Sequence, residues 1–286
     1  MSEKVKVVIS GINGRFGRAS ARLIAADDEL ELVGAFGRPG APYVGQDVAT
    51  LTGSATTGIL VSNEFKDLPS GINPDVVLDF SLSAPAFEIA KQALESGVRP
   101  VIGTSGVGED HIKVLTEIAN RKRLGAFVVP NFSVGAVLMM EFSKMAGQFF
   151  DNVEIVEMHH TEKQDAPSGT AMHTTKKLAE NGKHFNKKTI QEHELLDNSR
   201  GGRTDAGVRV HSLRLPGLIS HQEVIFGAPG ELLTVRHDSF NTDCFLVGIK
   251  MAVLAVMQMD GLVIGLDKIL NLNGAASKEK VGGRAS

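Results

Sequence analysis

The chain contains a single cysteine, Cys244, so it cannot form an internal disulfide. This is typical of proteins in a reducing compartment. It also lacks a long hydrophobic run: the longest apolar stretch, residues 245–259, includes Lys250 and Gln258 and is too short to span a bilayer. The N-terminal residues do not resemble a signal peptide, because they lack an apolar stretch followed by a small-residue cleavage site. Together these absences predict a cytoplasmic protein with no membrane partner.

Basic residues show no surplus. There are 30 Lys and Arg against 33 Asp and Glu, which gives a formal net charge of -3. A nucleic-acid partner is therefore not expected, whereas a small anionic ligand needs only a local positive pocket. The sequence also has no H-E-x-x-H motif and no cysteine cluster, so no metal site is expected.

The first part of the chain alternates short apolar runs with helical patterns. A length of 286 residues favours two domains. We expect strands at 5–10, 30–36, 75–80, 99–103 and 125–129, and helices at 15–26, 84–96 and 108–123. Such alternation predicts a parallel sheet covered on both faces, hence a Rossmann-type α/β domain over residues 1–132.

The pattern changes after Asn131. Helices are expected at 134–147 and 168–181, and β-rich stretches at 152–160, 207–215, 221–226 and 232–237, with a long loop at 182–206. This predicts an α+β domain with a mixed sheet over residues 133–241. Residues 242–286 are expected to supply a helix at 242–259 that returns to the first domain, followed by a frayed tail from residue 273.

A glycine turn follows the first expected strand: Gly11-Ile-Asn-Gly14-Arg-Phe-Gly17. Glycines let the backbone approach a pyrophosphate, and the following helix offers free N–H groups. Asn13 is a candidate for a left-handed position, because Asn tolerates positive φ. An ordinary βα turn is the alternative, but the strand and helix on either side favour a dinucleotide site.

The second strand ends without the usual carboxylate. An acidic residue about 20 residues past the turn normally binds the ribose 2′-hydroxyl. Here the strand ends Ala35-Phe36-Gly37-Arg38. A glycine leaves room, and Arg38 can pair with a 2′-phosphate, so NADPH is expected to be preferred and NADH remains possible. The alternative is that Arg38 is a solvated loop residue.

Two further loops follow expected parallel strands, Asp79-Phe80-Ser81 and Gly103-Thr104-Ser105-Gly106. In open α/β sheets, ligands bind at the carboxyl ends of the strands. These loops are therefore expected beside the nicotinamide ribose and ring, although loops without a ligand are the alternative.

The most specific segment runs from Glu157 to Ala171, with the sequence EMHHTEKQDAPSGTA. Ser168 is a plausible N-cap, and the helix start behind it is an anion site. Lys163 adds a cation suited to a carboxylate or to proton donation. His159 and His160 are adjacent in an expected strand and so face opposite ways, unless the strand breaks there. We therefore expect one histidine to face the substrate.

These motifs resemble the dihydrodipicolinate reductase family, whose members carry G-x-x-G-R-M-G near the N-terminus and E-x-H-H-x-x-K-x-D-A-P-S-G-T-A centrally. The similarity extends over roughly residues 4–272 and includes 79–81, 103–104, 131–135 and 221–224. It implies a Rossmann-type domain, an α+β substrate domain, hinges near Asn131 and Asn241, and a homotetramer. The implied substrate is a small cyclic 2,6-dicarboxylate of diaminopimelate and lysine synthesis.

The resemblance also implies roles for individual residues. His159 and Lys163 match the catalytic histidine and lysine, and His160, Gly169 and Thr170 match the substrate-carboxylate contacts, to which the helix start adds Ser168. The expected cofactor contacts lie in the glycine turn and the loops after the strands: Gly11, Ile12, Asn13, Gly14, Arg15, Phe16, Arg38, Phe80, Gly103, Thr104, Ser105, Val129, Pro130, Asn131 and Phe132.

Three positions depart from the family pattern. Gly37 stands where Asp or Glu is usual, which argues against NADH. Phe16 replaces a common methionine, and Phe240 stands where many relatives carry an arginine. The expected activity is reduction of 4-hydroxy-tetrahydrodipicolinate; the alternative is a non-catalytic NADPH-binding sensor of the same fold. A dehydrogenase with a cysteine nucleophile is disfavoured because Cys244 lies in an apolar pattern. A Tyr-x-x-x-Lys enzyme is excluded because Tyr43, the single tyrosine, has no lysine four residues on.

Overall fold

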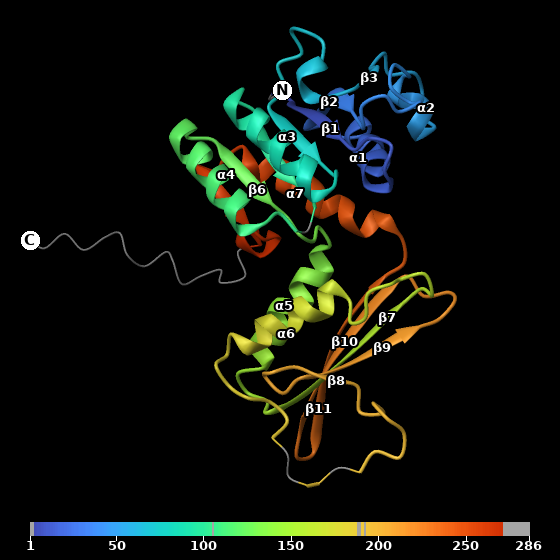
Figure 1. Cartoon of the computed structure of the whole chain (residues 1–286), viewed down its shortest axis with the longest axis vertical. Helices are drawn as coiled ribbons and strands as arrows, with labels where there is room; N and C mark the ends of the chain where they lie inside the picture. Colours follow the sequence, from blue (N-terminus) through green and yellow to red (C-terminus); the bar gives the residue numbers. More distant parts are fainter. Residues whose placement is uncertain (1–2, 105, 188–189, 192, 271–286) are drawn as a thin grey trace, which may run out of the picture. The chain divides into compact units, whose positions relative to one another are not determined.

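The computed structural model describes residues 3–104, 106–187, 190–191 and 193–270. The chain forms two compact units (Figure 1). Unit 1 comprises the residues up to Phe132 together with those from Phe245 onward, and unit 2 comprises Ser133–Cys244. The tail from residue 273, for which fraying was expected, lies outside the described residues. None of the described helices is long and apolar enough to cross a membrane.

Unit 1 is built on a seven-stranded sheet in which every pair of neighbours is parallel. The order is β12-β6-β5-β4-β1-β2-β3. The expected Rossmann-type fold is therefore confirmed, with β12 added beyond β6. The strands are β1 Val5–Ser10, β2 Leu30–Phe36, β3 Val61–Ser62, β4 Val76–Asp79, β5 Arg99–Ile102, β6 Gly125–Val128 and β12 Gly261–Ile264.

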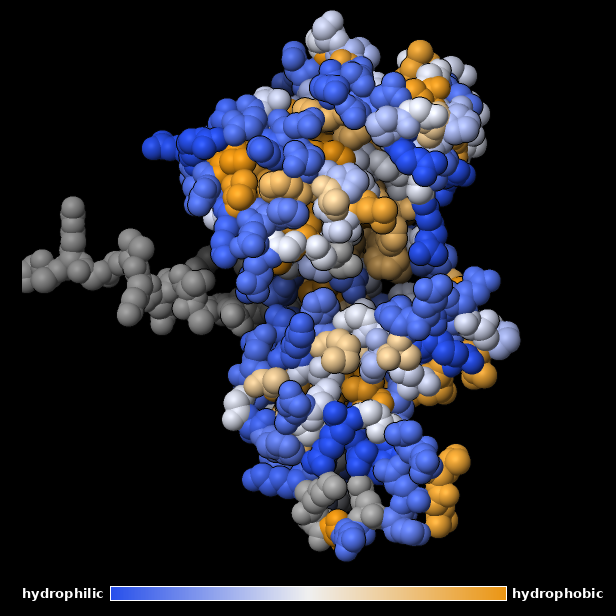
Figure 2. All heavy atoms as spheres, viewed as in Figure 1, coloured by the Kyte–Doolittle hydropathy of each residue, from blue (hydrophilic) through white to orange (hydrophobic). Residues whose placement is uncertain are grey.

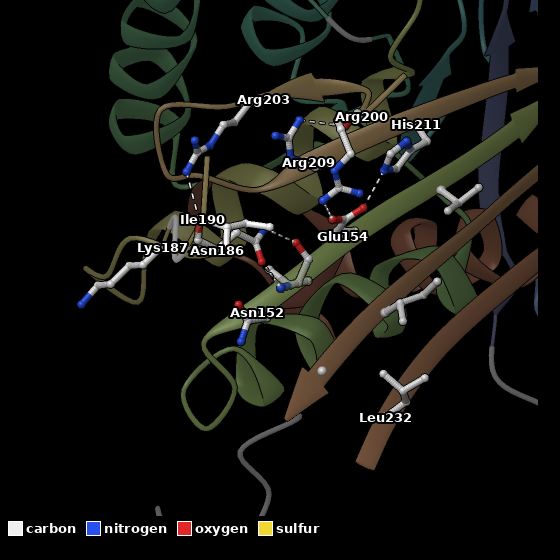
Figure 3. A pocket seen from close by; sticks show the side chains of 14 residues that line it. Asn152, Glu154, Asn186, Lys187, Ile190, Arg200, Arg203, Arg209, His211 and Leu232 are labelled. Atoms are coloured by element: carbon white, nitrogen blue, oxygen red, sulfur yellow. Dashed lines mark hydrogen bonds and ion pairs between the residues drawn. The ribbon is translucent and has the colours of Figure 1, made fainter. Parts of the chain in front are cut away.

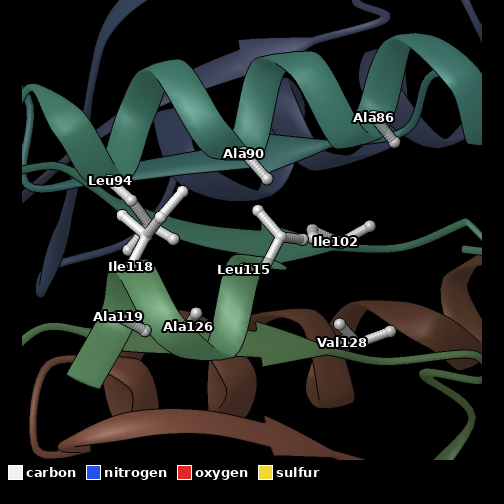
Figure 4. Packing of buried hydrophobic residues seen from close by; sticks show 9 residues of the cluster. All are labelled: Ala86, Ala90, Leu94, Ile102, Leu115, Ile118, Ala119, Ala126 and Val128. Atoms are coloured by element: carbon white, nitrogen blue, oxygen red, sulfur yellow. The ribbon is translucent and has the colours of Figure 1, made fainter. Parts of the chain in front are cut away.

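Helices cover this sheet and bury its apolar strands. They are α1 Arg15–Ala25, α2 Val48–Thr52, α3 Ser83–Glu95, α4 Glu109–Lys122 and α7 Leu246–Val256. Figure 4 shows one part of the core, where Leu115 of α4 lies against Ile102 of β5 and Leu94 of α3 lies farther along the same cluster. All three side chains are fully buried. Each such side chain contributes about 2 kcal/mol, so the core fixes the strands whose ends form the ligand edge.

The strand order reverses between β1 and β4, which are neighbours. Ser10 and Asp79 end these two strands side by side. The connections that follow them run in opposite directions, which opens a crevice at this edge of the sheet. The glycine turn after β1 and the loop after β4 therefore lie together.

Unit 2 has a mixed five-stranded sheet, as expected, in the order β11-β10-β7-β9-β8. Only β7 and β9 are parallel to each other. Along β7, residues with odd numbers are buried and those with even numbers are partly exposed. The elements are α5 Val134–Ala146, β7 Asn152–His159, α6 Gly169–Ala179, β8 Gly202–Arg203, β9 Arg209–Arg214, β10 Ser220–Ala228 and β11 Glu231–Ser239.

Some short elements were not expected from the sequence. They include α2, β3, β12 and β8, the last of which lies in the segment expected to be a loop. The helix expected at 242–259 is instead a 3₁₀ turn at Thr242–Phe245 followed by α7. The surface seen in Figure 2 is mainly hydrophilic over both units, with hydrophobic residues in small groups.

Candidate active site

At two positions of the glycine turn in unit 1, the neighbouring backbone leaves no room for a side chain. Gly11 has a φ of 73°, and a Cβ on it would lie 3.1 Å from the Phe80 backbone. A Cβ on Gly17 would lie 2.4 Å from the Gly11 carbonyl oxygen. The expectation that Asn13 takes a left-handed conformation is wrong: that geometry belongs to Gly11, while the Asn13 carbonyl accepts a 3.0 Å hydrogen bond from Arg18 Nε.

The start of α1 is open to a ligand. Gly14 is its N-cap, and no described side chain caps the first turn. No acidic residue lies in that turn either, and the neighbouring Arg15 is exposed. Free N–H groups at the positive end of a helix favour a phosphate. The chain therefore fits the pyrophosphate of a dinucleotide at this turn.

Four residues expected to bind the cofactor gather at the sheet edge. The Phe16 and Phe80 rings stack with their centroids 5.6 Å apart, and Phe132 meets Phe80 edge-on at 6.0 Å. A Cβ on Gly103 would lie 2.8 Å from both the Phe80 and Phe132 rings. The glycine therefore lets the two rings close over the end of β5. Phe245 extends this aromatic cluster by packing on Phe16 at 4.9 Å.

The remaining expected cofactor residues differ in what they can offer. The side chains of Ile12 and Val129 are fully buried, so only their backbone groups can face a ligand. Thr104 and Asn131 are partly buried and Pro130 is exposed, whereas Ser105 lies outside the described residues. Asp79, which belongs to a loop expected beside the nicotinamide but was not among the expected cofactor contacts, is buried at the end of β4. Burial raises its pKa, although hydrogen bonds from Ser10 and Ser81 oppose the shift.

A cavity of about 490 Å³ adjoins the glycine turn. Its lining includes Gly11 after β1, Gly37 and Arg38 after β2, and Tyr43, Asn63 and Leu82. This lies within the range of small-ligand sites. Its position beside the turn is where the adenosine half of a dinucleotide binds in Rossmann-type folds.

In unit 2, His159 ends β7 with hydrogen bonds at both ring nitrogens. Its Nδ1 lies 2.5 Å from Oε2 of Glu157, and its Nε2 lies 3.0 Å from the Ser220 hydroxyl. An ionised carboxylate only accepts, so Nδ1 carries the hydrogen. Nε2 of the neutral ring then accepts from Ser220. The ring is thereby fixed in both orientation and tautomer.

Glu157 is fully buried and has hydrogen-bond partners in addition to His159. Its two oxygens accept hydrogen bonds of 2.8 and 3.0 Å from Arg214, and Oε1 also accepts from the Ser168 backbone N–H at 3.2 Å. Burial by itself raises the pKa of Glu157, but hydrogen bonds from His159, Arg214 and Ser212 outweigh it and lower the pKa from 4.5 to about 2. Glu157 is therefore ionised at neutral pH and stabilises positive charge on the histidine ring.

Lys163 lies in the short loop after β7. Its Nζ forms a 2.6 Å ion pair with Asp165, and 21% of its side chain is exposed. The hydrogen bond from Lys163 lowers the pKa of Asp165 more than burial raises it. The Lys163 backbone N–H donates to the His160 carbonyl, and the His160 side chain is partly exposed. The loop thus keeps a cation two residues from an aspartate, within reach of solvent.

The start of α6 has the expected cap. Ser168 accepts a 3.2 Å hydrogen bond from the Ala171 N–H and is itself buried. Gly169 and Thr170 form the first turn, and nothing lies within 4 Å of a Cβ built on Gly169. The Ser168 hydroxyl is therefore engaged in capping, while the backbone beside Gly169 is open to an anion.

Sequence reasoning gave no role to Glu157, Arg214 or Ser220. Glu157 could have been found, since residues two apart on a strand share a face. The other two reach His159 only through strand register, because Arg214 on β9 and Ser220 on β10 both pair with it. Register between distant segments leaves no local signal in the sequence.

A second cavity in unit 2, of about 640 Å³, lies on the opposite face of the sheet from His159. Figure 3 shows Glu154 at its centre, and this residue accepts hydrogen bonds of 2.7 Å from both Arg200 and His211. Arg203, Arg209 and Lys187 also line it. This cavity was not expected from the sequence. Among the described residues, no group of three or more His, Cys, Asp or Glu side chains is placed to hold a metal ion.

An open glycine turn at the switch point of a parallel sheet is the cofactor-binding arrangement of nicotinamide-dependent dehydrogenases. The chain is an oxidoreductase of that class. Two family models match it: "Dihydrodipicolinate reductase, N-terminus" over residues 5–132 and "Dihydrodipicolinate reductase, C-terminus" over residues 135–270. The chain therefore belongs to the dihydrodipicolinate reductase family.

Similar proteins share nearly the whole length. The chain is 42% identical to the 4-hydroxy-tetrahydrodipicolinate reductase of Synechococcus elongatus, over 94% of this chain and 100% of that protein. It is 41% identical to the reductase of the same name from Syntrophomonas wolfei, with the same coverage. It also matches the structure of dipicolinate-bound dihydrodipicolinate reductase from Paenisporosarcina, with 37% identity, a TM-score of 0.84, and coverage of 94% of this chain and 100% of that one. No finding favours the alternative of a non-catalytic sensor.

Proposed function

We propose that the chain reduces 4-hydroxy-tetrahydrodipicolinate to tetrahydrodipicolinate in the synthesis of diaminopimelate and lysine, with NADPH as the preferred cofactor. The observation that carries this proposal is the match to the family in both halves of the chain. The buried Glu157–His159 pair beside an open helix start supports it, because reduction of a dicarboxylate needs an anion site and a proton source.

One carboxylate of the substrate binds at the start of α6. The backbone of Gly169 and Thr170 supplies free N–H groups there, and Ser168 holds the turn through its cap. Lys163 and His160 lie in the segment leading to this turn and supply positive charge and a hydrogen-bond donor. A helix start and a lysine together bind a carboxylate more strongly than either alone.

The proton that completes reduction comes from His159 or Lys163. Nε2 of His159, which accepts from the Ser220 hydroxyl in the neutral ring, becomes a donor once the ring takes up a proton, and the ionised Glu157 behind Nδ1 stabilises the protonated ring. Lys163 is the alternative donor, since it is partly exposed and paired to Asp165. When bound, the reduced nicotinamide supplies the hydride to the ring carbon of the substrate.

NADPH is preferred over NADH because no carboxylate stands at the end of β2. Gly37 and Arg38 line the cavity beside the glycine turn. A guanidinium there pairs with a 2′-phosphate, whereas a 2′-hydroxyl gains little from it. The aromatic cluster of Phe16, Phe80 and Phe132, with Gly103, offers an apolar surface for the nicotinamide end.

Assembly into a homotetramer, in the cytoplasm, is part of the proposal. The sheet face opposite His159 supports self-association, since Val156 and Ile225 on it are only partly buried and Leu232 beside them is 75% exposed. Exposed apolar patches of this kind mark interfaces. Light scattering coupled to size-exclusion chromatography of the full chain should give about four times the mass of one chain. We expect Leu232→Glu to lower that mass and Leu60→Glu, an exposed leucine of unit 1, to leave it unchanged.

The activity is tested by following NADPH oxidation when the freshly made product of the preceding synthase is added, and by repeating the assay with NADH. We expect oxidation that depends on this product and is faster with NADPH at low cofactor concentration. Tight NADPH binding without oxidation would overturn the proposal in favour of the sensor.

A further inference from the structure

At the edge of the cofactor cavity, the Tyr43 ring occupies the space that a side chain at position 37 would need. A Cβ on Gly37 would lie 2.5 Å from Cε2 and 2.6 Å from the hydroxyl oxygen of Tyr43. Gly37 is not in the left-handed region of φ, so its backbone conformation suits any residue. The glycine is therefore required by the tyrosine ring and by nothing in its own geometry.

The Tyr43 ring is held in this position by the backbone. Its hydroxyl oxygen accepts a 3.0 Å hydrogen bond from the N–H of Arg38. The Ala41 N–H donates to the Arg38 carbonyl and the Gln46 N–H to the Tyr43 carbonyl, so the loop folds back between the two residues. Moving the ring aside would break the bond to Arg38, and a side chain at position 37 therefore carries that cost.

The Tyr43 hydroxyl keeps its own hydrogen for a ligand. Within the described part of the chain, its one hydrogen bond is the one it accepts from Arg38. Tyr43, Arg38 and Gly37 all line the cavity. The hydroxyl and the guanidinium are thus two donors at the end of β2, where the ribose of a dinucleotide binds.

Carboxylates elsewhere in the cavity do not replace the missing one. Glu64 is paired to Lys66 at 2.7 Å, and Glu88 belongs to α3, on the other wall. Neither follows β2, from which the ribose hydroxyls are normally bound. Cofactor selection therefore rests on the loop that contains Gly37, Arg38 and Tyr43.

We propose that Tyr43 is a specificity-determining residue for the cofactor: its ring excludes a carboxylate at position 37, and its hydroxyl donates to the 2′-phosphate of NADPH. This inference rests on the NADPH preference proposed above. It adds a steric reason why an NADH-type residue does not fit at position 37, and it names a second phosphate donor beside Arg38.

The hydroxyl is tested by binding of NADPH and NADH to the full chain, measured by calorimetry without substrate. Tyr43→Phe keeps the ring and removes the donor. A hydrogen bond to a charged group corresponds to roughly a tenfold change in Kd, so we expect about tenfold weaker NADPH binding and less than about twofold weaker NADH binding. The unpaired Arg38 N–H affects both cofactors alike, so equal losses would overturn the phosphate contact.

The steric part is tested by a double-mutant cycle on the same measurement. Gly37→Asp alone should not improve NADH binding, whereas Gly37→Asp in a Tyr43→Ala background should improve it about tenfold over Tyr43→Ala alone. An equal gain in both backgrounds would overturn the competition for space. If Tyr43→Ala does not fold, as judged by thermal unfolding, Tyr43→Ser serves as the background.

The two proposals fail in distinguishable ways. Wild-type protein that binds NADPH and NADH equally would overturn the cofactor preference, yet the cycle would still measure the coupling of positions 37 and 43. Wild-type protein that prefers NADPH, together with a Tyr43→Phe variant that keeps the full preference, would overturn the role of the tyrosine hydroxyl alone.

Discussion

Oε2 of Glu157 lies 2.5 Å from Nδ1 of His159, two residues along the same face of β7. Since Glu157 is fully buried and also binds Arg214, it cannot turn away to release the ring. The distance between the two side chains is set by the strand, and hydrogen bonds that outweigh burial keep the negative charge beside the ring. Glu157 is thus a positioning residue for His159.

Replacing Glu157 by Gln keeps the shape and removes the charge. We expect kcat to fall about 10- to 100-fold with little change in cofactor affinity, because an amide holds the ring without stabilising positive charge on it. The pH profile of kcat should move as well, which a purely structural defect would not cause. Steady-state kinetics from pH 6 to 9 measure both effects.

Glu154→Gln is the matched control for that variant. Glu154 lies on the same strand and also pairs with one arginine and one histidine, but it faces the other side of the sheet. We expect its kcat and pH profile to match those of the wild type. A similar loss in both variants would mean that the strand, and not the His159 pair, is what the substitution disturbs.

The buried carboxylate also predicts how stability depends on pH. The pKa of Glu157 is lowered from 4.5 to about 2 in the folded chain. Because the folded pKa lies below the unfolded one, its contribution is fully present above about pH 4.5 and is lost as the pH falls toward 2. A shift of this size corresponds to about 3 kcal/mol. Urea unfolding at pH 7 and pH 3 should show this pH dependence in the wild type.

The variant isolates this contribution from those of the other carboxylates. In Glu157→Gln, the difference in unfolding free energy between pH 7 and pH 3 should shrink by about 2 kcal/mol, because pH 3 still lies above the folded pKa of about 2 and part of the contribution remains there. At pH 7 the variant should be less stable by about 2–4 kcal/mol, since Arg214 then lacks its ionic partner. An unchanged pH dependence would show that folding does not lower the pKa of Glu157.

Much of the fold follows from hydrophobic periodicity. The expected strand at 30–36 coincides with β2, because a short, mainly apolar run between polar turns favours a buried strand in an α/β chain. Elements of two to five residues, such as β3 and α2, escaped prediction, because their formation depends on the sheet edge they pack against. The expectation for Asn13 was wrong because the left-handed backbone conformation occurs at Gly11, which faces the Phe80 backbone.

The candidate site divides in the same way. His159, Lys163 and Ser168 share one segment of sequence, so their proximity was predictable. Arg214 and Ser220 belong to strands that pair with β7 from either side, and only register brings them to His159. The close approach of the Tyr43 ring to Gly37 could not be predicted either, because the distance between two residues of an irregular loop does not follow from their separation in sequence. Sequence patterns therefore predict which site residues of one segment lie together, whereas strand pairing determines which residues of distant segments join them.

Removing the Lys163 amine tests its role in binding or proton transfer. We expect Lys163→Ala to lower kcat/KM at least about 100-fold while NADPH affinity stays unchanged, because the lysine belongs to the unit without the cofactor turn. Lys183→Ala is the control, since Lys183 also pairs with an aspartate of unit 2, at 2.9 Å. Near-normal kcat in Lys163→Ala would contradict the assignment of a catalytic role.

Gly17→Ala tests whether the tight approach of α1 to the glycine turn is what shapes the cofactor site. The new Cβ would lie 2.4 Å from the Gly11 carbonyl oxygen and 2.7 Å from the Ile12 Cα. Alanine favours helices by about 1 kcal/mol over glycine, so any loss is steric. We expect a net loss of about 1–3 kcal/mol in unfolding free energy, and NADPH binding weakened more than about tenfold.

Gly108→Ala separates this effect from the general cost of losing a glycine. Gly108 precedes α4 with an ordinary φ of -66°, and nothing lies within 4 Å of a Cβ built there. That variant should lose less than about 1 kcal/mol and bind NADPH normally. If Gly17→Ala behaves like Gly108→Ala in calorimetry and thermal unfolding, the backbone of the turn has room to yield, and contact between Gly11 and α1 does not define the pyrophosphate site.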